Sequence, residues 1–145
     1  MAIKINSKTR SLVVAATTWV ELRQLIEQEL RRQGPDADLN FIDTSLITDM
    51  TGLFANTGYE IRNIKIGEWN TSNVARMSNM FYDCTDLNCD LSHWDTSNVT
   101  NTEEMFYYCI NFNCDLSKWN LSSLKYSGGM FIGTHKLEPN NRPII

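Results

Sequence analysis

The sequence predicts an α/β repeat fold, a solenoid of about four 25-residue coils behind an N-terminal helical cap. Residues 69–93 and 94–118 share one pattern, in which a tryptophan, T-S-N-V, a Met-Phe pair, two cysteines and D-L-S all return 25 residues later. A weaker copy starts at Trp119, and an earlier one is recognisable from Asp43. Periods of roughly 20 to 50 residues are typical of arrays in which each unit covers the apolar face of its neighbour.

Length and charge limit the function classes. The 145 residues, 42% of them hydrophobic, fit one domain, which we divide into a cap (1–36) and a repeat segment (37–145) packed together. The cap holds six Lys and Arg against four Asp and Glu, whereas the repeat segment holds seven against thirteen. An acidic repeat surface repels phosphate backbones, so a nucleic-acid partner is disfavoured and another protein is the expected partner.

The N-terminal cap is predicted to contain a hairpin and one helix. Residues 2–16 alternate weakly between apolar and polar, which favours two short strands. Thr18 and Glu21 form a capping box, and Gly34-Pro35 marks the end of the helix. Five apolar residues recur at helical spacing between these signals: Trp19, Leu22, Leu25, Ile26 and Leu30. Four charged residues are expected on the opposite, solvated side, with a partner contact as the alternative: Arg23, Glu27, Arg31 and Arg32.

Each repeat is predicted to contain a strand, a turn and a short helix. Leu87, Cys89 and Leu91 alternate with polar residues, the pattern of a half-buried strand. By repeat phase we expect strands near 37–42, 64–69, 89–94, 114–119 and 139–144. Apolar residues from Val74 to Cys84, and again from Val99 to Cys109, follow helical spacing, and small polar residues such as those at 95–98 would cap these helices.

Large side chains at constant repeat phase predict the core. Two columns are expected to be buried: Ile42, Trp69, Trp94, Trp119 and Ile144; and Phe54, Phe81, Phe106 and Phe131. The four cysteines, Cys84, Cys89, Cys109 and Cys114, also follow the repeat, so we interpret them as free, buried thiols. A strained Cys89–Cys114 disulfide is the alternative, and zinc is disfavoured because each pair is five residues apart.

The repeat W-[DN]-T-S-N-V-x-x-M-x-x-M-F-x-x-C-x-x-[LF]-N-x-D-L-S closely resembles the BspA-like leucine-rich repeat family of bacterial surface proteins and mycoplasma-type lipoproteins. The segment before it, LRQLIEQELRRQGPDADLNFIDTSLITDMTGLF, resembles the entry that often precedes these repeats, so the resemblance covers about residues 17–138. It implies a right-handed leucine-rich-repeat-like solenoid that binds a protein or a host surface, and it supplies no catalytic residue. Long secreted members carry many copies and an export or anchoring signal, which this sequence does not show.

The expected function is non-enzymatic protein binding. His93 and His135 are 42 residues apart, and no phosphate-binding motif is present, so neither catalysis nor a cofactor is predicted. Polar residues facing outward from the predicted strands are the first candidate binding surface: Asp38, Lys65, Asp90, Ser92, His93, Asp115, Ser117 and Lys118. Tyrosines of the convex side are the second: Tyr82, Tyr107 and Tyr108, with Tyr126 in the same group. For both surfaces, ordinary solvated or covering side chains remain the alternative.

Location and assembly are expected to follow from size and segment composition. No apolar run approaches the roughly 20 residues of a membrane helix, and residues 12–16 only faintly resemble a signal peptide. The chain as written is therefore predicted to be cytoplasmic, a monomer or weak dimer, and an inhibitor or adaptor, for example one carried by a mobile element. A secreted or surface-exposed protein that binds host or envelope proteins is the alternative.

Overall fold

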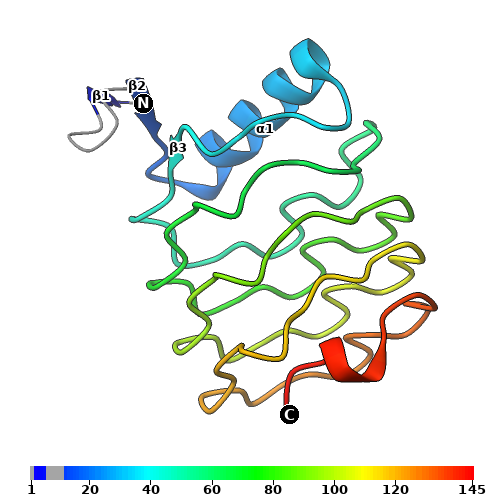
Figure 1. The fold of residues 1–145 in the computed structure, drawn as a ribbon. Helices are drawn as coiled ribbons and strands as arrows, with labels where there is room; N and C mark the ends of the chain where they lie inside the picture. Colours follow the sequence, from blue (N-terminus) through cyan, green and yellow to red (C-terminus); the bar gives the residue numbers. More distant parts are fainter. Residues whose placement is uncertain (1, 6–11) are drawn as a thin grey trace.

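The computed structural model describes residues 2–5 and 12–145. In chain order it contains β1 (Ala2–Ile5), β2 (Leu12–Ala15), α1 (Trp19–Gln33), β3 (Ile42–Asp43) and a 3-10 helix at Pro139–Asn141. The sheet and α1 lie at one end of the molecule, and the chain then runs back and forth in successive layers toward the C terminus (Figure 1).

The predicted hairpin is confirmed and belongs to a small sheet of order β1-β2-β3. β1 and β2 are antiparallel, with Ile3 opposite Val14, although the turn between them falls outside the described residues. β2 then pairs in parallel with β3, where Val14 lies opposite Ile42. Backbone hydrogen bonds of this sheet therefore join the predicted cap directly to the first layer of the repeat segment.

The predicted helix is confirmed as α1, with both of its end signals. The Thr18 hydroxyl oxygen accepts a hydrogen bond from the Glu21 N–H at 3.2 Å, and Gly34, with φ of 85°, ends the helix by donating its N–H to the Leu30 carbonyl. The expected apolar side chains are buried except Trp19, which is 38% exposed.

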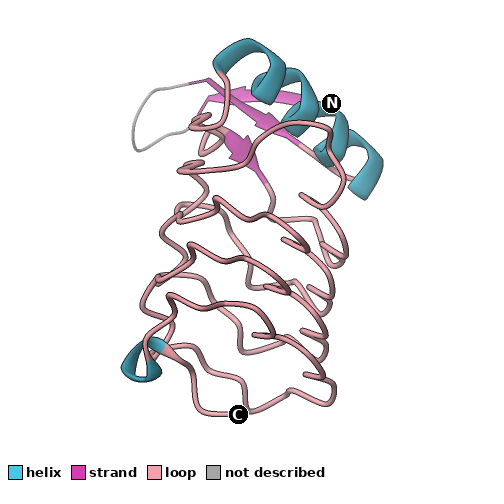
Figure 2. Cartoon of the chain, turned by 90° about the vertical axis from the view of Figure 1, so that its right-hand side faces the viewer, coloured by secondary structure: helices cyan, strands magenta, loops and turns pink. Residues whose placement is uncertain are grey.

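The predicted solenoid of strand-plus-helix coils, with a right-handed leucine-rich-repeat-like architecture, is wrong. Within the described residues the structure has one α-helix, one short 3-10 helix and a small three-stranded sheet. Residues 44–138, for which most of the strands and all of the short helices were expected, form turns and irregular segments joined by isolated bridges (Figure 2). The segment 139–144 begins with the 3-10 helix instead of forming a last strand.

Backbone conformation explains why helical spacing did not produce helices. Four segments, which we call the turn rows (50–56, 77–83, 102–108 and 127–133), each contain two residues with positive φ, four positions apart. In the second row these are Asn79 (φ 55°) and Asp83 (φ 58°). A residue in the left-handed region interrupts a right-handed helix, so apolar residues spaced three and four apart face the core from a series of tight turns.

Hydrogen bonds between turn rows all run in one direction. Alternate N–H groups of the second row, at Met77, Asn79, Phe81 and Asp83, donate to carbonyls of the third row or of the residue just before it, at 2.8–3.0 Å. The third row donates in the same way to the fourth. In this part of each layer, N–H groups therefore point toward the C-terminal end of the molecule and carbonyls toward α1.

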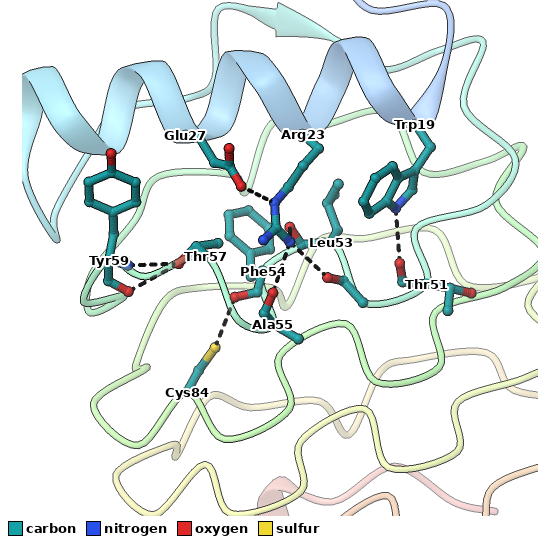
Figure 3. A network of polar contacts seen from close by, with 11 residues as sticks. Trp19, Arg23, Glu27, Thr51, Leu53, Phe54, Ala55, Thr57, Tyr59 and Cys84 are labelled. Atoms are coloured by element: carbon teal, nitrogen blue, oxygen red, sulfur yellow. Dashed lines mark hydrogen bonds and ion pairs between the residues drawn. The ribbon is translucent and has the colours of Figure 1, made fainter.

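In the described part of the chain, carbonyls of the first turn row receive no N–H group from a preceding row, and side chains of α1 donate to them instead. The Trp19 indole N–H donates to the Thr51 carbonyl at 2.9 Å, and Arg23 donates to the carbonyls of Leu53 at 3.0 Å and Ala55 at 2.9 Å (Figure 3). These carbonyls correspond to those that receive N–H groups in later rows. The prediction that Arg23 is solvated is therefore wrong, since its side chain is only 14% exposed.

The T-S-N motif ties each layer to both neighbours, so its predicted role as a helix cap is also wrong. The Thr96 hydroxyl donates to the Asn120 carbonyl in the following layer at 3.0 Å, and the Asn98 side-chain amide donates to the Ser72 carbonyl in the preceding layer at 2.7 Å. Equivalent threonine and asparagine bonds recur in the preceding repeat.

Aromatic columns fill the interior as expected, except at the C-terminal end. Trp69, Trp94 and Trp119 stack with ring centroids 6.4 Å apart, and each donates its indole N–H to a carbonyl of the preceding layer. Ile144, predicted as the last member of this column, is instead 89% exposed. All four cysteines are free thiols, and Cys114 is half-buried while the others are buried.

Candidate binding surfaces

A groove lies between α1 and the turn rows. It has a volume of about 670 Å³. Its lining residues come from the helix and from three successive turn rows: Trp19, Arg23, Glu27, Gly52, Ala55, Asn56, Asn79, Tyr82 and Glu104. Because Trp19 and Arg23 are held by backbone carbonyls of the first row, as Figure 3 shows, the helical wall of the groove is fixed in place.

Stacked tyrosines continue from the groove down the turn face. The rings of Tyr82 and Tyr107 are nearly parallel with centroids 4.9 Å apart, and Tyr108 packs against Tyr107 at 4.8 Å with a tilt of 53°. Tyr108 is 44% exposed, and Ile132, which follows Tyr107 by one repeat, is 53% exposed. The structure therefore brings Tyr82, Tyr107 and Tyr108 together in an aromatic strip that is open to solvent and ends at the groove.

Acidic side chains border this surface. Glu104 accepts a hydrogen bond from the Asn79 side chain at 2.9 Å, and Glu27 accepts one from Arg23 at 2.6 Å. The Arg23 charge is thus shared between Glu27 and three carbonyls. Partial burial, with smaller effects from the two neighbouring tyrosines, raises the pKa of Tyr107, so its phenol stays protonated and can donate a hydrogen bond.

The outward polar residues predicted from the strand phase have local roles in turns. Asp38, Asp90 and Asp115 each accept the N–H of the residue two positions later, at 2.9–3.1 Å. Hydrogen bonds from Ser92 and Ser117 lower the pKa values of Asp90 and Asp115 respectively. One carboxylate oxygen of each aspartate is therefore already occupied by its own turn.

These polar residues come from successive layers. Asp38 pairs with Lys65 through a backbone bridge, and Asp90, Ser92 and Asp115 line a hollow of about 340 Å³. His93 and Lys118 are exposed, and Ser117 is half-buried with its N–H on Asp115.

The thiols are suited to packing. Burial raises the pKa of Cys84 to about 12 and that of Cys114 to about 11, so both are protonated at neutral pH. No cluster suited to a metal ion occurs among the described residues. Over residues 2–5 and 12–145, no helix combines the length and apolar character needed to cross a bilayer.

Sequence reasoning missed most of the groove. It placed Arg23 and Glu27 together on one side of the helix but expected solvent there, and it placed Asn79 and Glu104 inside short helices. The available signal was the constant repeat phase of Gly52, Asn79 and Glu104, three of the positions with positive φ. This phase indicates that the three residues lie in adjacent layers. The groove exists only because α1 packs beside them, which the repeat phase does not predict.

Comparison with protein families gives one match. The model of a family described as "Mycoplasma protein of unknown function, DUF285" matches residues 23–142. The comparisons with curated proteins and with solved structures gave no match. The matched range includes most of α1, all four turn rows, the aromatic strip and every lining residue of the groove except Trp19.

Proposed function

The chain belongs to the Mycoplasma-type DUF285 family, and from this premise we propose that it is a non-enzymatic protein-binding module that acts through its turn face. The observation that carries the proposal is the aromatic strip of Tyr82, Tyr107 and Tyr108, which is stacked, partly exposed and continuous with the groove. Tyrosine and tryptophan are enriched in the energetically dominant parts of protein interfaces.

Rigidity supports binding at this surface. Tyr82 and Tyr107 stack on each other, and their backbones are held within successive turn rows. A partner that covers them therefore orders few additional side-chain torsions, which lowers the entropic cost of association. Trp19 offers a second aromatic anchor across the groove.

Charge supports a neutral or basic protein partner. Residues 37–118 hold four Lys and Arg against twelve Asp and Glu, and the groove itself contains Glu27 and Glu104. Such a surface attracts basic polypeptides and repels nucleic acid.

The proposed role is that of an intracellular inhibitor or adaptor, for example one encoded by a mobile element. The second candidate is a surface protein that binds host or envelope proteins, and the repeat's resemblance to BspA-like surface proteins supports it at the level of sequence. The two roles differ in the compartment of the partner, so co-purification from cytoplasmic and envelope fractions distinguishes them.

The surface itself is tested with paired variants. A photo-crosslinking residue at position 107 should capture the partner in the native cytoplasm or envelope. The double variant Tyr82→Ala, Tyr107→Ala should then reduce recovery of that partner at least tenfold, whereas Asp90→Lys, Asp115→Lys should not. Circular dichroism confirms that both variants are folded. Retention by the tyrosine variant together with loss by the aspartate variant would move the site to the polar residues predicted first.

A further inference from the structure

The last turn row differs from the three before it in its backbone donors. In the third row, the N–H groups of Glu104, Phe106 and Tyr108 donate to carbonyls of the last row, and that of Thr102 donates to Tyr126 just before it, at 2.7–3.0 Å. The corresponding groups of the last row belong to Ser127, Gly129, Phe131 and Gly133. They donate no hydrogen bond to any residue in 2–5 or 12–145.

The two ends of the stack of rows therefore differ in whether their backbone polar groups have hydrogen-bond partners. At the first row, Trp19 and Arg23 supply side-chain donors to the unpaired carbonyls. At the last row, no side chain of the described residues accepts from the four N–H groups. A series of unpaired backbone groups at regular spacing is a template for another polypeptide.

The four donors belong to residues that are partly exposed. Their residues are all half-buried, and Gly128 between them is exposed. Gly129 and Gly133 have no side chain to shield the backbone. Figure 2 places the last layers at the end of the molecule opposite α1.

The charge of this end is opposite to that of the preceding layers. Residues 119–145 hold three Lys and Arg against one Asp or Glu, whereas residues 37–118 hold four against twelve. The guanidinium carbon of Arg142 lies 5.5 Å from the centre of the Phe131 ring, and Lys136, three residues after Gly133, is exposed. One cation, Arg142, thus lies over a residue of the last row, and a second, Lys136, follows that row in the sequence.

We propose that the open end of the last turn row binds an acidic, extended segment of a partner protein. Carbonyl oxygens of that segment would accept from the N–H groups of residues 127–133, and its carboxylates would pair with Arg142 and Lys136. A second copy of this chain does not fit. Its own last row presents donors only, and the carbonyls of its first row are occupied by Trp19 and Arg23. This site is separate from the tyrosine strip, so either proposal can fail alone.

Amide hydrogen exchange of the full chain tests the free donors. The N–H groups of Ser127, Gly129, Phe131 and Gly133 should exchange at least a hundredfold faster than those of Thr102, Glu104, Phe106 and Tyr108, because only the latter are hydrogen-bonded. Equal protection of the two rows would show that the last row is already paired and would overturn the proposal.

Titration with a fluorescent ten-residue poly-glutamate peptide tests the ligand class. Binding should shift the NMR signals of the four last-row amides most, and poly-glutamine should bind more weakly because it lacks the charge. The variant Lys136→Glu, Arg142→Glu should lower poly-glutamate affinity about tenfold, since each exposed ion pair contributes modestly. The matched control, Lys65→Glu, Lys118→Glu, removes two cations elsewhere and should change the affinity less than twofold.

The outcomes are separable. An equal loss of poly-glutamate affinity in both charge variants would mean that net charge alone attracts the peptide, and it would overturn the proposed site. Signal shifts centred on Tyr82 and Tyr107 would likewise overturn it while leaving the turn-face proposal in place. Exchange that is fast, together with shifts at residues 127–133, supports the proposal even if no partner is captured through position 107.

Discussion

Two buried threonines of one repeat, Thr96 and Thr102, show how much the effect of a hydroxyl depends on its position. The Thr96 hydroxyl donates to the Asn120 carbonyl at 3.0 Å. The Thr102 hydroxyl is buried without a hydrogen-bond partner among the described residues. Thr102 occupies the phase held by Met50 and Met77 in earlier rows, where a polar atom is not needed.

Replacing these threonines with valine should have opposite effects. Thr102→Val should raise the free energy of unfolding by about 1 kcal/mol because it removes an unsatisfied buried hydroxyl of similar shape. Thr96→Val should lower it by about 1–3 kcal/mol because the Asn120 carbonyl loses its donor. Urea denaturation of both variants measures the difference, and a destabilised Thr102→Val would show that its hydroxyl has a partner.

Arg23 is the residue whose role differs most from expectation. Arg23→Met should lower the free energy of unfolding by about 2–4 kcal/mol, because the carbonyls of Leu53 and Ala55 lose a charged donor while the side-chain volume is nearly kept. Arg31→Met is the matched control on an exposed part of the same helix, and it should cost less than about 1 kcal/mol. Equal effects in urea denaturation would contradict the role of Arg23 as the donor for the first row.

At the scale of the elements, the sequence allowed prediction of those parts whose signals are local. The capping box of Thr18 and Glu21 and the Gly34-Pro35 stop predicted where α1 begins and ends. Alternation of apolar and polar residues predicted the hairpin of β1 and β2. The layers were not predictable in the same way. Apolar spacing between Val74 and Cys84 fits both a helix and a series of turns, and non-glycine residues such as Asn79 gave little indication of positive φ.

The candidate site shows the same limit. Repeat phase was enough to place Tyr82 and Tyr107 together, because residues one repeat apart occupy the same position in adjacent layers. The groove depends on the angle at which α1 lies across the first row, which only the packing of Trp19 and Arg23 determines. Ile144 could not be placed by phase because the chain leaves the pattern after Leu137, where prolines enter.

The segment after α1 is fastened by an ion pair that should respond to acid. Arg62 donates two hydrogen bonds to the Asp36 carboxylate, at 2.9 and 2.5 Å, and holds the pKa of Asp36 at about 2 instead of its ordinary 3.8. A lowered folded pKa means that the pair's contribution is present above about pH 3.8 and is lost as the pH falls through about 2.

Removing either Asp36 or Arg62 should make the free energy of unfolding less dependent on pH in the acidic range. In urea denaturation between pH 5 and pH 2, Asp36→Asn and Arg62→Gln should each lose less stability than the wild type, and the double variant should resemble either single variant. Additive effects in the double variant would mean that the two side chains act independently.

At the scale of the whole molecule, stability is expected to depend on layers stacked in phase. Deleting residues 94–118 joins His93 to Trp119, so each remaining layer still meets a neighbour in the same register. This variant should fold, with a urea m-value reduced by about a sixth, in proportion to its shorter chain. Deleting residues 94–106 breaks the register and should abolish cooperative unfolding. Circular dichroism during urea denaturation distinguishes the two, and equal behaviour of the deletions would contradict a phase requirement.

The indole column has an optical consequence. Trp69, Trp94 and Trp119 lie at equal centroid spacings of 6.4 Å with planes only 6° apart, so their electronic transitions are close enough and similarly oriented enough to couple. Nearly parallel stacked chromophores absorb with a shifted energy and an altered intensity compared with isolated indoles. Ultraviolet absorption therefore reports on the alignment of the layers, and replacing Trp94 with phenylalanine would weaken this effect because Trp69 and Trp119 would each lose their indole neighbour at 6.4 Å.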